Sequence, residues 1–310
     1  MSAPPPVRRF EVVLNRESGT LKDLWHDGLP DDLVAAFAEG GVEARIRAAV
    51  ASELDATLDQ AVSTRPDALI VGGGDGTVSH AASRLLGAEV PMGILPCGTF
   101  NLAARDLGVP LDPFDAARAL ATAEPRAIDV LAANGRTALC NLMLGFYPTM
   151  ARRQEEFHGR AWWVKSARIL RDLREAFYRT PPLLLKFESP EHGAIHRVTR
   201  FAAFVPGEYE DVLSVIPTRT HMDAGKIGIY VSKHKTVGAL ARGMAAYVFG
   251  LMKQEPELEQ LHATKLTLTS QQRDRLPASI DGEILDISLP LHLDLKPRAL
   301  RVLCPSASND

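Results

Sequence analysis

The sequence predicts an α/β protein with an N-terminal doubly wound α/β domain at residues 1–126 and a C-terminal β-sandwich-like domain at residues 127–310. Three observations predict this fold class. Strand-like and helix-like segments alternate over the first part of the chain, polar or glycine-rich loops follow three of the strands, and strand-like segments dominate after about residue 125. Such alternation favours a parallel sheet with helices on both faces.

The first domain is expected to contain strands and helices joined by short loops. An apolar strand at residues 9–14 precedes a polar segment at 15–20, and residues 30–39 have helical spacing that ends at a Gly-Gly pair. Ser52 is the expected N-cap of a helix whose apolar face includes residues 54, 58, 61 and 62. The other expected elements are strands at 42–47, 68–71 and 90–95, a helix ending near residue 86, and a helix at 102–107.

A glycine-rich loop at residues 72–79 follows the strand at 68–71. Glycine tolerates positive φ and lets a ligand approach the backbone closely. The N–H groups that begin the next helix, together with the helix dipole, form an anion site. We therefore interpret the loop as a phosphate cradle, with a tight turn that binds no ligand as the alternative. Neither GxxxxGK[ST] nor G-x-G-x-x-G is present, which disfavours a P-loop protein and a nicotinamide dehydrogenase.

Two further polar loops follow strands of the same predicted sheet, at residues 15–20 and 96–101. The carboxyl ends of parallel strands lie at one edge of a sheet, and ligands bind there. We therefore expect these two loops and the glycine-rich loop to converge on one site.

Strands dominate the second domain. Asn134-Gly135 between two strand-like segments predicts a hairpin. Further strands are expected at residues 183–188, 198–205, 227–232, 265–270, 284–289 and 291–295. Such a run predicts a sandwich or a flattened barrel. The final strand, at 299–304, either closes this domain or returns to the first.

A helical insertion is expected at residues 151–180. Between residues 152 and 179 there are eight Lys or Arg against four Asp or Glu, and Trp162 and Trp163 lie among them. Basic residues beside tryptophan suit a helix at an anionic lipid surface. An ordinary amphipathic helix packed on the second domain explains the same pattern.

Composition restricts the class of protein. The net charge of −3 argues against a strongly basic nucleic-acid binder. The three cysteines are far apart and form no CxxC pair, which fits a reducing compartment and argues against a zinc site. Residues 1–6 lack the apolar core of a signal peptide, and no apolar stretch reaches the length of a membrane span. We expect a soluble, cytoplasmic protein.

Three motifs together resemble the diacylglycerol kinase catalytic family, which includes bacterial soluble lipid kinases, sphingosine kinases and ceramide kinases. They are Gly-Gly-Asp-Gly-Thr at 73–77, Pro-x-Gly-Thr-x-Asn at 96–101, and Asp-Gly-Glu at 281–283. The first motif alone is shared with NAD kinases and phosphofructokinases. The resemblance covers nearly the whole chain and implies an ATP-dependent, Mg²⁺-dependent kinase that phosphorylates a lipid hydroxyl, most directly that of diacylglycerol.

The resemblance also implies roles for individual residues. Glu283 matches the general base that takes the proton from the lipid hydroxyl, beside an Asp-Gly turn that we expect to be flexible. Asp75 either binds magnesium with the nucleotide or holds the loop by accepting backbone amides. The implied nucleotide-binding residues are Asn15, Gly72, Gly73, Gly74, Asp75, Gly76, Thr77, Thr99 and Asn101.

The chain departs from the family's pattern at two places. Residues 44–51 lack the threonine or serine that the family tends to place after its second strand to contact the nucleotide. Bacterial members often carry an Asp-Gly pair whose aspartate helps to hold a structural magnesium ion. Here residue 224, before Gly225, is alanine, and Asp223 lies one position early, so Asp223 is the remaining candidate metal ligand.

Two alternatives remain open at this stage: an NAD kinase-like enzyme, and a non-catalytic nucleotide- or lipid-binding protein of the same fold. The expected partners are a lipid substrate and, through peripheral contact, the inner face of a membrane. We do not expect the protein to bind nucleic acid, and we expect it to form a homodimer.

Overall fold

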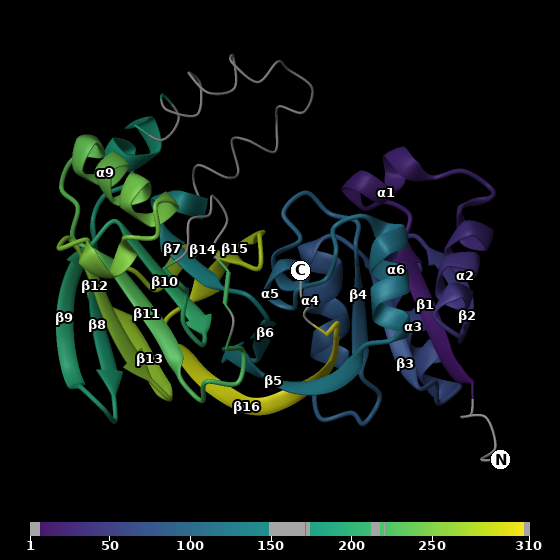
Figure 1. The fold of residues 1–310 in the computed structure, drawn as a ribbon. Helices are drawn as coiled ribbons and strands as arrows, with labels where there is room; N and C mark the ends of the chain where they lie inside the picture. The colour runs from purple at the N-terminus through teal and green to yellow at the C-terminus, as the bar shows by residue number, and fades with distance from the viewer. Residues whose placement is uncertain (1–6, 149–170, 172–173, 212–217, 220, 307–310) are drawn as a thin grey trace. The chain divides into compact units, whose positions relative to one another are not determined.

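The computed structural model describes residues 7–148, 171, 174–211, 218–219 and 221–306 (Figure 1). It divides into two units. Unit 1 comprises Met1–Asp129 and Pro297–Asp310, and unit 2 comprises Val130–Lys296. Two long strands, β5 (Glu124–Ala133) and β16 (Leu291–Cys304), contribute residues to both units.

Unit 1 contains a parallel sheet in the order β2-β1-β3-β4, followed by the C-terminal end of β16, where Val302 pairs with Met92. Its strands are β1 (Arg8–Asn15), β2 (Val42–Ala49), β3 (Ala68–Gly73) and β4 (Met92–Pro96). Every residue of β3 is buried, as expected for a central parallel strand. The predicted α/β class is therefore confirmed.

Helices cover both faces of this sheet. They are α1 (Gly19–Leu24), α2 (Leu29–Glu39), the 3₁₀ turn η1 (Ala51–Glu53), α3 (Leu54–Ser63), α4 (Asp75–Arg84), α5 (Leu102–Asp106) and α6 (Pro113–Ala121). α2 is joined to α6 by an ion pair between Glu39 and Arg118, and α3 to α4 by one between Asp55 and Arg84. Right-handed crossovers in this strand order place the α2 connection and the α3 and α4 connections on opposite faces.

Two local predictions in unit 1 were wrong or incomplete. Ser52 does not cap α3: it lies inside η1, and Glu53 is the N-cap, without a side-chain hydrogen bond. α6 was not expected, although Asp112-Pro113 is a helix-start signal and Asp112 Oδ1 accepts hydrogen bonds from Phe114 N and Asp115 N.

Unit 2 consists of two antiparallel sheets. One has the order β12-β11-β10-β7-β14-β15, and the other contains β13, β8, β9 and the first part of β16. The strands are β6 (Arg136–Ala138), β7 (Leu142–Gly145), β8 (Leu183–Ser189), β9 (Gly193–Thr199), β10 (Phe201–Pro206), β11 (Ile227–Ser232), β12 (Leu258–Ala263), β13 (Lys265–Ser270), β14 (Arg275–Ile280) and β15 (Glu283–Ser288). Unit 2 also contains helix α9 (Val237–Val248) and the 3₁₀ turn η2 (Met252–Gln254).

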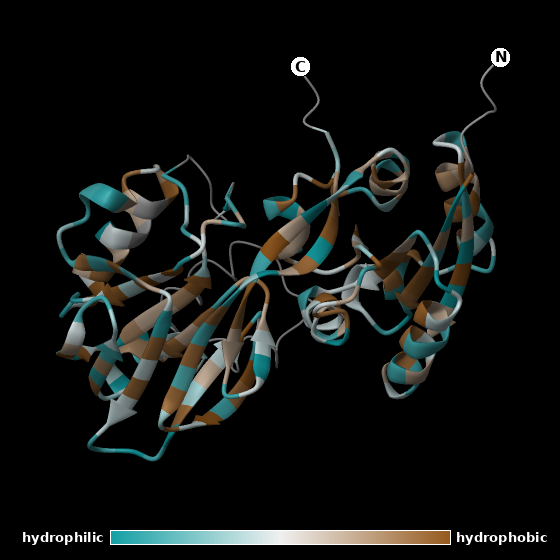
Figure 2. Cartoon of the chain, turned by 90° about the horizontal axis from the view of Figure 1, so that it is seen from below, coloured by the Kyte–Doolittle hydropathy of each residue, from teal (hydrophilic) through white to brown (hydrophobic). Residues whose placement is uncertain are grey.

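The core of unit 2 lies between its two sheets. Phe187 of β8 and Phe204 of β10 contact each other with ring centroids 6.3 Å apart. Figure 2 shows apolar and polar positions alternating along many of these strands, as one buried face per strand requires. The expected sandwich-like arrangement is therefore confirmed.

The strands of unit 2 differ from the prediction in several places. β12 and β14 were not expected, and the strand expected at 137–142 is two short strands, β6 and β7. The single strand expected at 198–205 is two strands, β9 and β10, which meet at Arg200. The two strands expected at 291–295 and 299–304 are one strand, β16, which contains Arg298 at φ 50°. Trp162 and Trp163 lie outside the described residues. Among the helices that the structure describes, none has both the length and the apolar character needed to cross a membrane.

Candidate active site

The glycine-rich loop joins β3 to α4. Helix α4 begins at Asp75, with Gly74 as its N-cap. The first intrahelical hydrogen bond runs from Val78 N to Gly74 O at 3.0 Å, so the N–H groups of residues 75–77 precede the helical ladder. Those groups and the positive end of the helix dipole favour an anion. The loop therefore has the geometry that a phosphate cradle requires.

Two glycines of this loop, Gly72 and Gly73, serve close packing rather than unusual dihedral angles. None of the four has a positive φ, so the expectation that glycine is used here for positive φ was wrong. A Cβ on Gly73 would lie 2.6 Å from the side chain of Thr77. A Cβ on Gly76 would meet no protein atom within 4 Å. Gly76 therefore borders open space beside the helix N-terminus.

Asp75 connects the glycine-rich loop to the loop after β4. Its Oδ1 accepts a hydrogen bond from Leu102 N at 2.7 Å, and its Oδ2 accepts one from Asn101 N at 3.1 Å. These are the bonds expected of the loop-holding role. The magnesium-binding role of Asp75 stays a prediction.

Asn101 organises the loop after β4. Its backbone is left-handed (φ 51°, ψ 46°), a conformation that asparagine adopts more readily than most residues. Its side chain spans the loop, since Oδ1 accepts from Gly98 N at 2.8 Å and Nδ2 donates to Gly98 O at 2.9 Å. A Cβ on Gly98 would lie 2.6 Å from Gly74 Cα, so the two loops pack backbone against backbone. Thr99, on the same loop, is exposed.

Asn15, at the end of β1, brings in the third loop. Its Nδ2 donates to Thr77 Oγ1 at 2.9 Å, and its Oδ1 accepts from Glu17 N at 3.1 Å. Thr20, which belongs to none of the sequence motifs, donates from Oγ1 to Gly98 O at 3.1 Å. The three loops therefore meet at the carboxyl ends of β1, β3 and β4, as the parallel sheet predicts.

Cys97 lies on the loop after β4 but is not a candidate nucleophile. The side chain is buried, and burial raises the pKa of its thiol to about 12. A thiol with so high a pKa stays protonated near neutral pH, whereas the thiolate is the reactive form.

Glu283 lies in unit 2, at the first position of β15. It follows the β14–β15 turn, in which Asp281 and Gly282 both have positive φ, at 48° and 89°. Its side chain is exposed, as a group that exchanges a proton with a substrate must be.

Asp281 makes this turn rigid. Its carboxylate is buried and accepts three backbone hydrogen bonds: Oδ2 from Leu139 N at 2.7 Å, and Oδ1 from Cys140 N at 2.8 Å and Asn141 N at 2.9 Å. The expectation of a flexible Asp-Gly turn was therefore wrong. The only sequence signal for this anchor is an aspartate whose partners lie about 140 residues earlier.

Asp129 holds β5 and β16 together within unit 1. It is buried, and its Oδ1 accepts a hydrogen bond from Arg298 N at 2.9 Å. This bond lies next to the positions at which both strands pass from one unit into the other.

Asp223 is exposed in a turn before β11. The neighbouring Lys226 forms an ion pair with Glu208 at 2.9 Å. Among the described residues, one group of His, Cys, Asp or Glu side chains has donor atoms close enough to hold an ion, and Asp223 is not part of it. The metal-binding role of Asp223 stays a prediction.

Comparison with known proteins identifies a family for the first part of the chain. Residues 9–133 match the family described as the diacylglycerol kinase catalytic domain, so the resemblance predicted from the sequence is confirmed. The match includes the glycine-rich loop and the loop after β4.

Two curated relatives illustrate the similarity. A "Probable lipid kinase YegS-like" protein of Citrobacter koseri is 33% identical over 124 residues, which cover 38% of this chain and 41% of the relative. A "Diacylglycerol kinase" of Mycobacterium tuberculosis is 49% identical over 53 residues, 17% of each chain. The chain thus matches less than half the length of these relatives.

Solved structures show the same fold over the whole chain. The structure of a diacylglycerol kinase from Bacillus anthracis aligns with a TM-score of 0.68 and 18% identity, covering 98% of this chain and 99% of the other. A second Bacillus anthracis structure aligns with a TM-score of 0.75 and 20% identity, covering 99% and 98%.

Proposed function

We propose that this protein is an ATP-dependent lipid kinase that transfers the γ-phosphate of ATP to the hydroxyl of a lipid, with diacylglycerol as the first candidate acceptor. One observation carries the proposal: a glycine-rich loop whose helix-terminal N–H groups precede the helical ladder, held in place by Asp75, within a segment that matches the diacylglycerol kinase catalytic domain.

The nucleotide side of the reaction depends on positioning. Phosphoryl transfer needs mainly orientation and charge stabilisation from the protein. The N–H groups of residues 75–77 and the hydroxyl of Thr77 are the proposed phosphate ligands, and Gly76 leaves space for the phosphates to approach. A magnesium ion bound with ATP would supply charge neutralisation. Asp75 is a candidate ligand, since Mg²⁺ is usually bound through one or two carboxylates together with the phosphates of its substrate.

Glu283 is the proposed general base on the acceptor side. It takes the proton of the lipid hydroxyl as that oxygen bonds to the γ-phosphorus. The bond from the γ-phosphorus to the bridging oxygen then breaks, and ADP leaves. General-base catalysis typically contributes about 10²–10⁴-fold in rate. The Asp281 anchor supports this role, because it fixes the backbone two residues before the base.

The proposal is tested by transfer of label from [γ-³²P]ATP into a mixed lipid extract, followed by mass spectrometry of the labelled lipid. We expect Glu283→Gln to lower turnover by about 10²–10⁴-fold with little change in ATP affinity. Asp286→Asn, an exposed position on the same strand, is the matched control.

Three other results of this labelling experiment would change the proposal. Unchanged turnover in Glu283→Gln would remove that residue as the base. Label in NAD instead of a lipid would favour an NAD kinase-like enzyme. ATP binding without transfer to any acceptor would favour a non-catalytic binding protein.

We further propose that the lipid is taken from a membrane surface, with the segment around Trp162 and Trp163 making the contact. The support is the excess of basic residues beside the tryptophans. Co-sedimentation with phosphatidylglycerol vesicles, compared with phosphatidylcholine vesicles, tests it. Equal binding to both, or to neither, would contradict it.

A further inference from the structure

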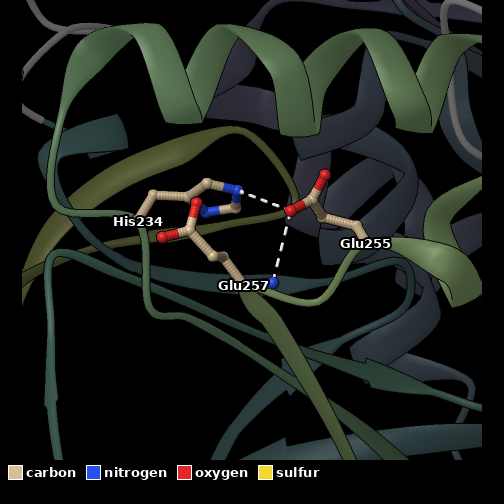
Figure 3. A group of neighbouring side chains, drawn as sticks. All are labelled: His234, Glu255 and Glu257. Atoms are coloured by element: carbon tan, nitrogen blue, oxygen red, sulfur yellow. Dashed lines mark hydrogen bonds and ion pairs between the residues drawn. The ribbon is translucent and has the colours of Figure 1, made fainter.

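We propose that His234, Glu255 and Glu257 form a binding site for a divalent transition-metal ion. His234 lies two residues after β11, and the two glutamates lie between η2 and β12. Figure 3 shows the imidazole ring with both carboxylates turned toward it. One potential ligand atom from each side chain lies within 4.8 Å of the others.

The buried imidazole is the strongest indication of a ligand. The side chain of His234 is only 4% exposed, yet its Nε2 makes no hydrogen bond. The nearest carboxylate oxygen, Glu255 Oε1, is 3.5 Å away, close enough for an ion pair but without hydrogen-bond geometry. Buried polar atoms are normally satisfied, so an orphaned ring nitrogen needs an explanation such as an ion.

The other ring nitrogen is held as in many metal-binding histidines. His234 Nδ1 lies 2.8 Å from Ser232 Oγ, which is itself buried. When Nδ1–H donates to this hydroxyl, Nε2 carries the lone pair that a metal ion needs. The serine therefore fixes both the tautomer and the direction of the ring.

Helix α9 packs closely on the imidazole ring. A Cβ on Gly243 would lie 2.5 Å from Nε2, which is closer than a side chain can approach. The glycine therefore lets the helix backbone cover the ring without a side chain colliding with the proposed ligand atom.

The two carboxylates already hold a cation. Arg242 Nη2 lies 2.6 Å from Glu257 Oε2 and 3.3 Å from Glu255 Oε1. The Arg242 side chain is 57% exposed, so the guanidinium can move into solvent when a metal ion takes its place. A doubly charged ion compensates both carboxylates, whereas the guanidinium compensates one.

The donor set selects the kind of ion. One imidazole nitrogen and two carboxylates suit Zn²⁺ and neighbouring transition-metal ions, whereas Mg²⁺ prefers oxygen ligands and water. The ligands link the end of β11 to the start of β12, so the ion would stabilise unit 2. This inference does not depend on the proposed kinase activity.

The test is a Zn²⁺ titration of the full-length protein in competition with a chromophoric chelator, with Mg²⁺ as the comparison ion. We expect one Zn²⁺ to bind tightly and Mg²⁺ not to compete. His234→Ala and Glu257→Gln should each weaken binding by at least about tenfold. His262→Ala is the matched control, because His262 pairs with a single carboxylate, Glu208, in the same unit.

Arg242→Ala provides the sharpest test. Removing a competing, partly exposed guanidinium should tighten Zn²⁺ binding by about two- to fivefold. If His234→Ala does not fold, the absorption spectrum of bound Co²⁺ is compared between the wild type and Glu257→Gln instead. The two spectra should differ, because one ligand of the ion has changed. Absence of stoichiometric Zn²⁺ binding, equal affinity in wild type and ligand variants, loss of the ion in His262→Ala, or weaker binding in Arg242→Ala would each overturn the proposal.

Discussion

Asp281→Asn should destabilise unit 2 far more than its isosteric shape suggests. The substitution keeps one oxygen, which can still accept from Cys140 N and Asn141 N as Oδ1 does now. The amide nitrogen then takes the position of Oδ2 and faces Leu139 N–H, a donor that has its partner at 2.7 Å in the native protein. One hydrogen bond is lost and two lose the assistance of the charge.

The magnitude follows from the burial of the site. A hydrogen bond to a charged group contributes about 1.5–3 kcal/mol, and a buried donor left unsatisfied costs about 1–3 kcal/mol. Because these terms overlap, we expect a loss of about 2–4 kcal/mol in the free energy of unfolding. For a unit of this size that corresponds to a fall in Tm of roughly 4–16 °C.

Hydrogen exchange measured by mass spectrometry is the assay best matched to this change. Amides in peptides covering residues 139–141 should exchange faster in Asp281→Asn, while peptides from β1 should be unaffected. Asp274→Asn, an exposed aspartate just before β14, should leave both unchanged. If Asp281→Asn matched the wild type in Tm and in exchange at 139–141, the three-amide anchor would not matter for stability, and the reasoning would be refuted.

Four further substitutions test the site and the surface charges. Asp75→Asn should weaken ATP binding by about tenfold, because one of its two amide partners is lost; unchanged affinity in an ATP titration would contradict the anchoring role. Gly76→Ala should leave Tm unchanged but weaken ATP binding. Gly73→Ala should lower the free energy of unfolding by about 1–3 kcal/mol, because its Cβ collides with the side chain of Thr77. If the two variants changed Tm and ATP affinity equally, the packing argument would be contradicted. The hydrogen bond from Arg197 holds the pKa of Glu259 below its usual 4.5, so the ionised Glu259 stabilises the fold fully above pH 4.5. This stabilisation is lost as the pH falls through the lowered pKa. In acid unfolding, the stability of Glu259→Gln should therefore fall less over this pH range than that of the wild type.

Local patterns predicted the first unit well because each parallel strand is an apolar run followed by a polar or glycine-rich loop. The same logic failed in unit 2, at the expected strand 198–205. Phe201 N donates to Thr199 Oγ1 at 3.1 Å, and that hydroxyl donates to Phe201 O at 2.7 Å. The side chain of the residue between them, Arg200, turns to Phe177 O at 2.8 Å. The hydroxyl of Thr199 thus takes the place of a backbone partner in the hydrogen-bond ladder, and β9 ends there.

The candidate site shows a related limit. Glycines and an aspartate in sequence indicate a phosphate loop, and parallel topology indicates that three loops meet. The sequence does not indicate which backbone amides each carboxylate binds. Asp75 binds amides 26 and 27 residues away, and Asp281 binds amides 140 to 142 residues away.

Both aspartates precede a glycine. For Asp75 the sequence left open a magnesium ligand or an acceptor of backbone amides, and for Asp281 it suggested a flexible turn. In the structure both side chains accept the backbone amides of a distant loop and fix a neighbouring segment. For Asp75 the neighbour is the phosphate loop, and for Asp281 it is Glu283. Replacing either by alanine in an activity assay therefore mixes loss of position with loss of chemistry. The isosteric asparagine and glutamine variants separate the two, because Glu283→Gln removes a proton acceptor without touching an anchor, and Asp281→Asn does the reverse.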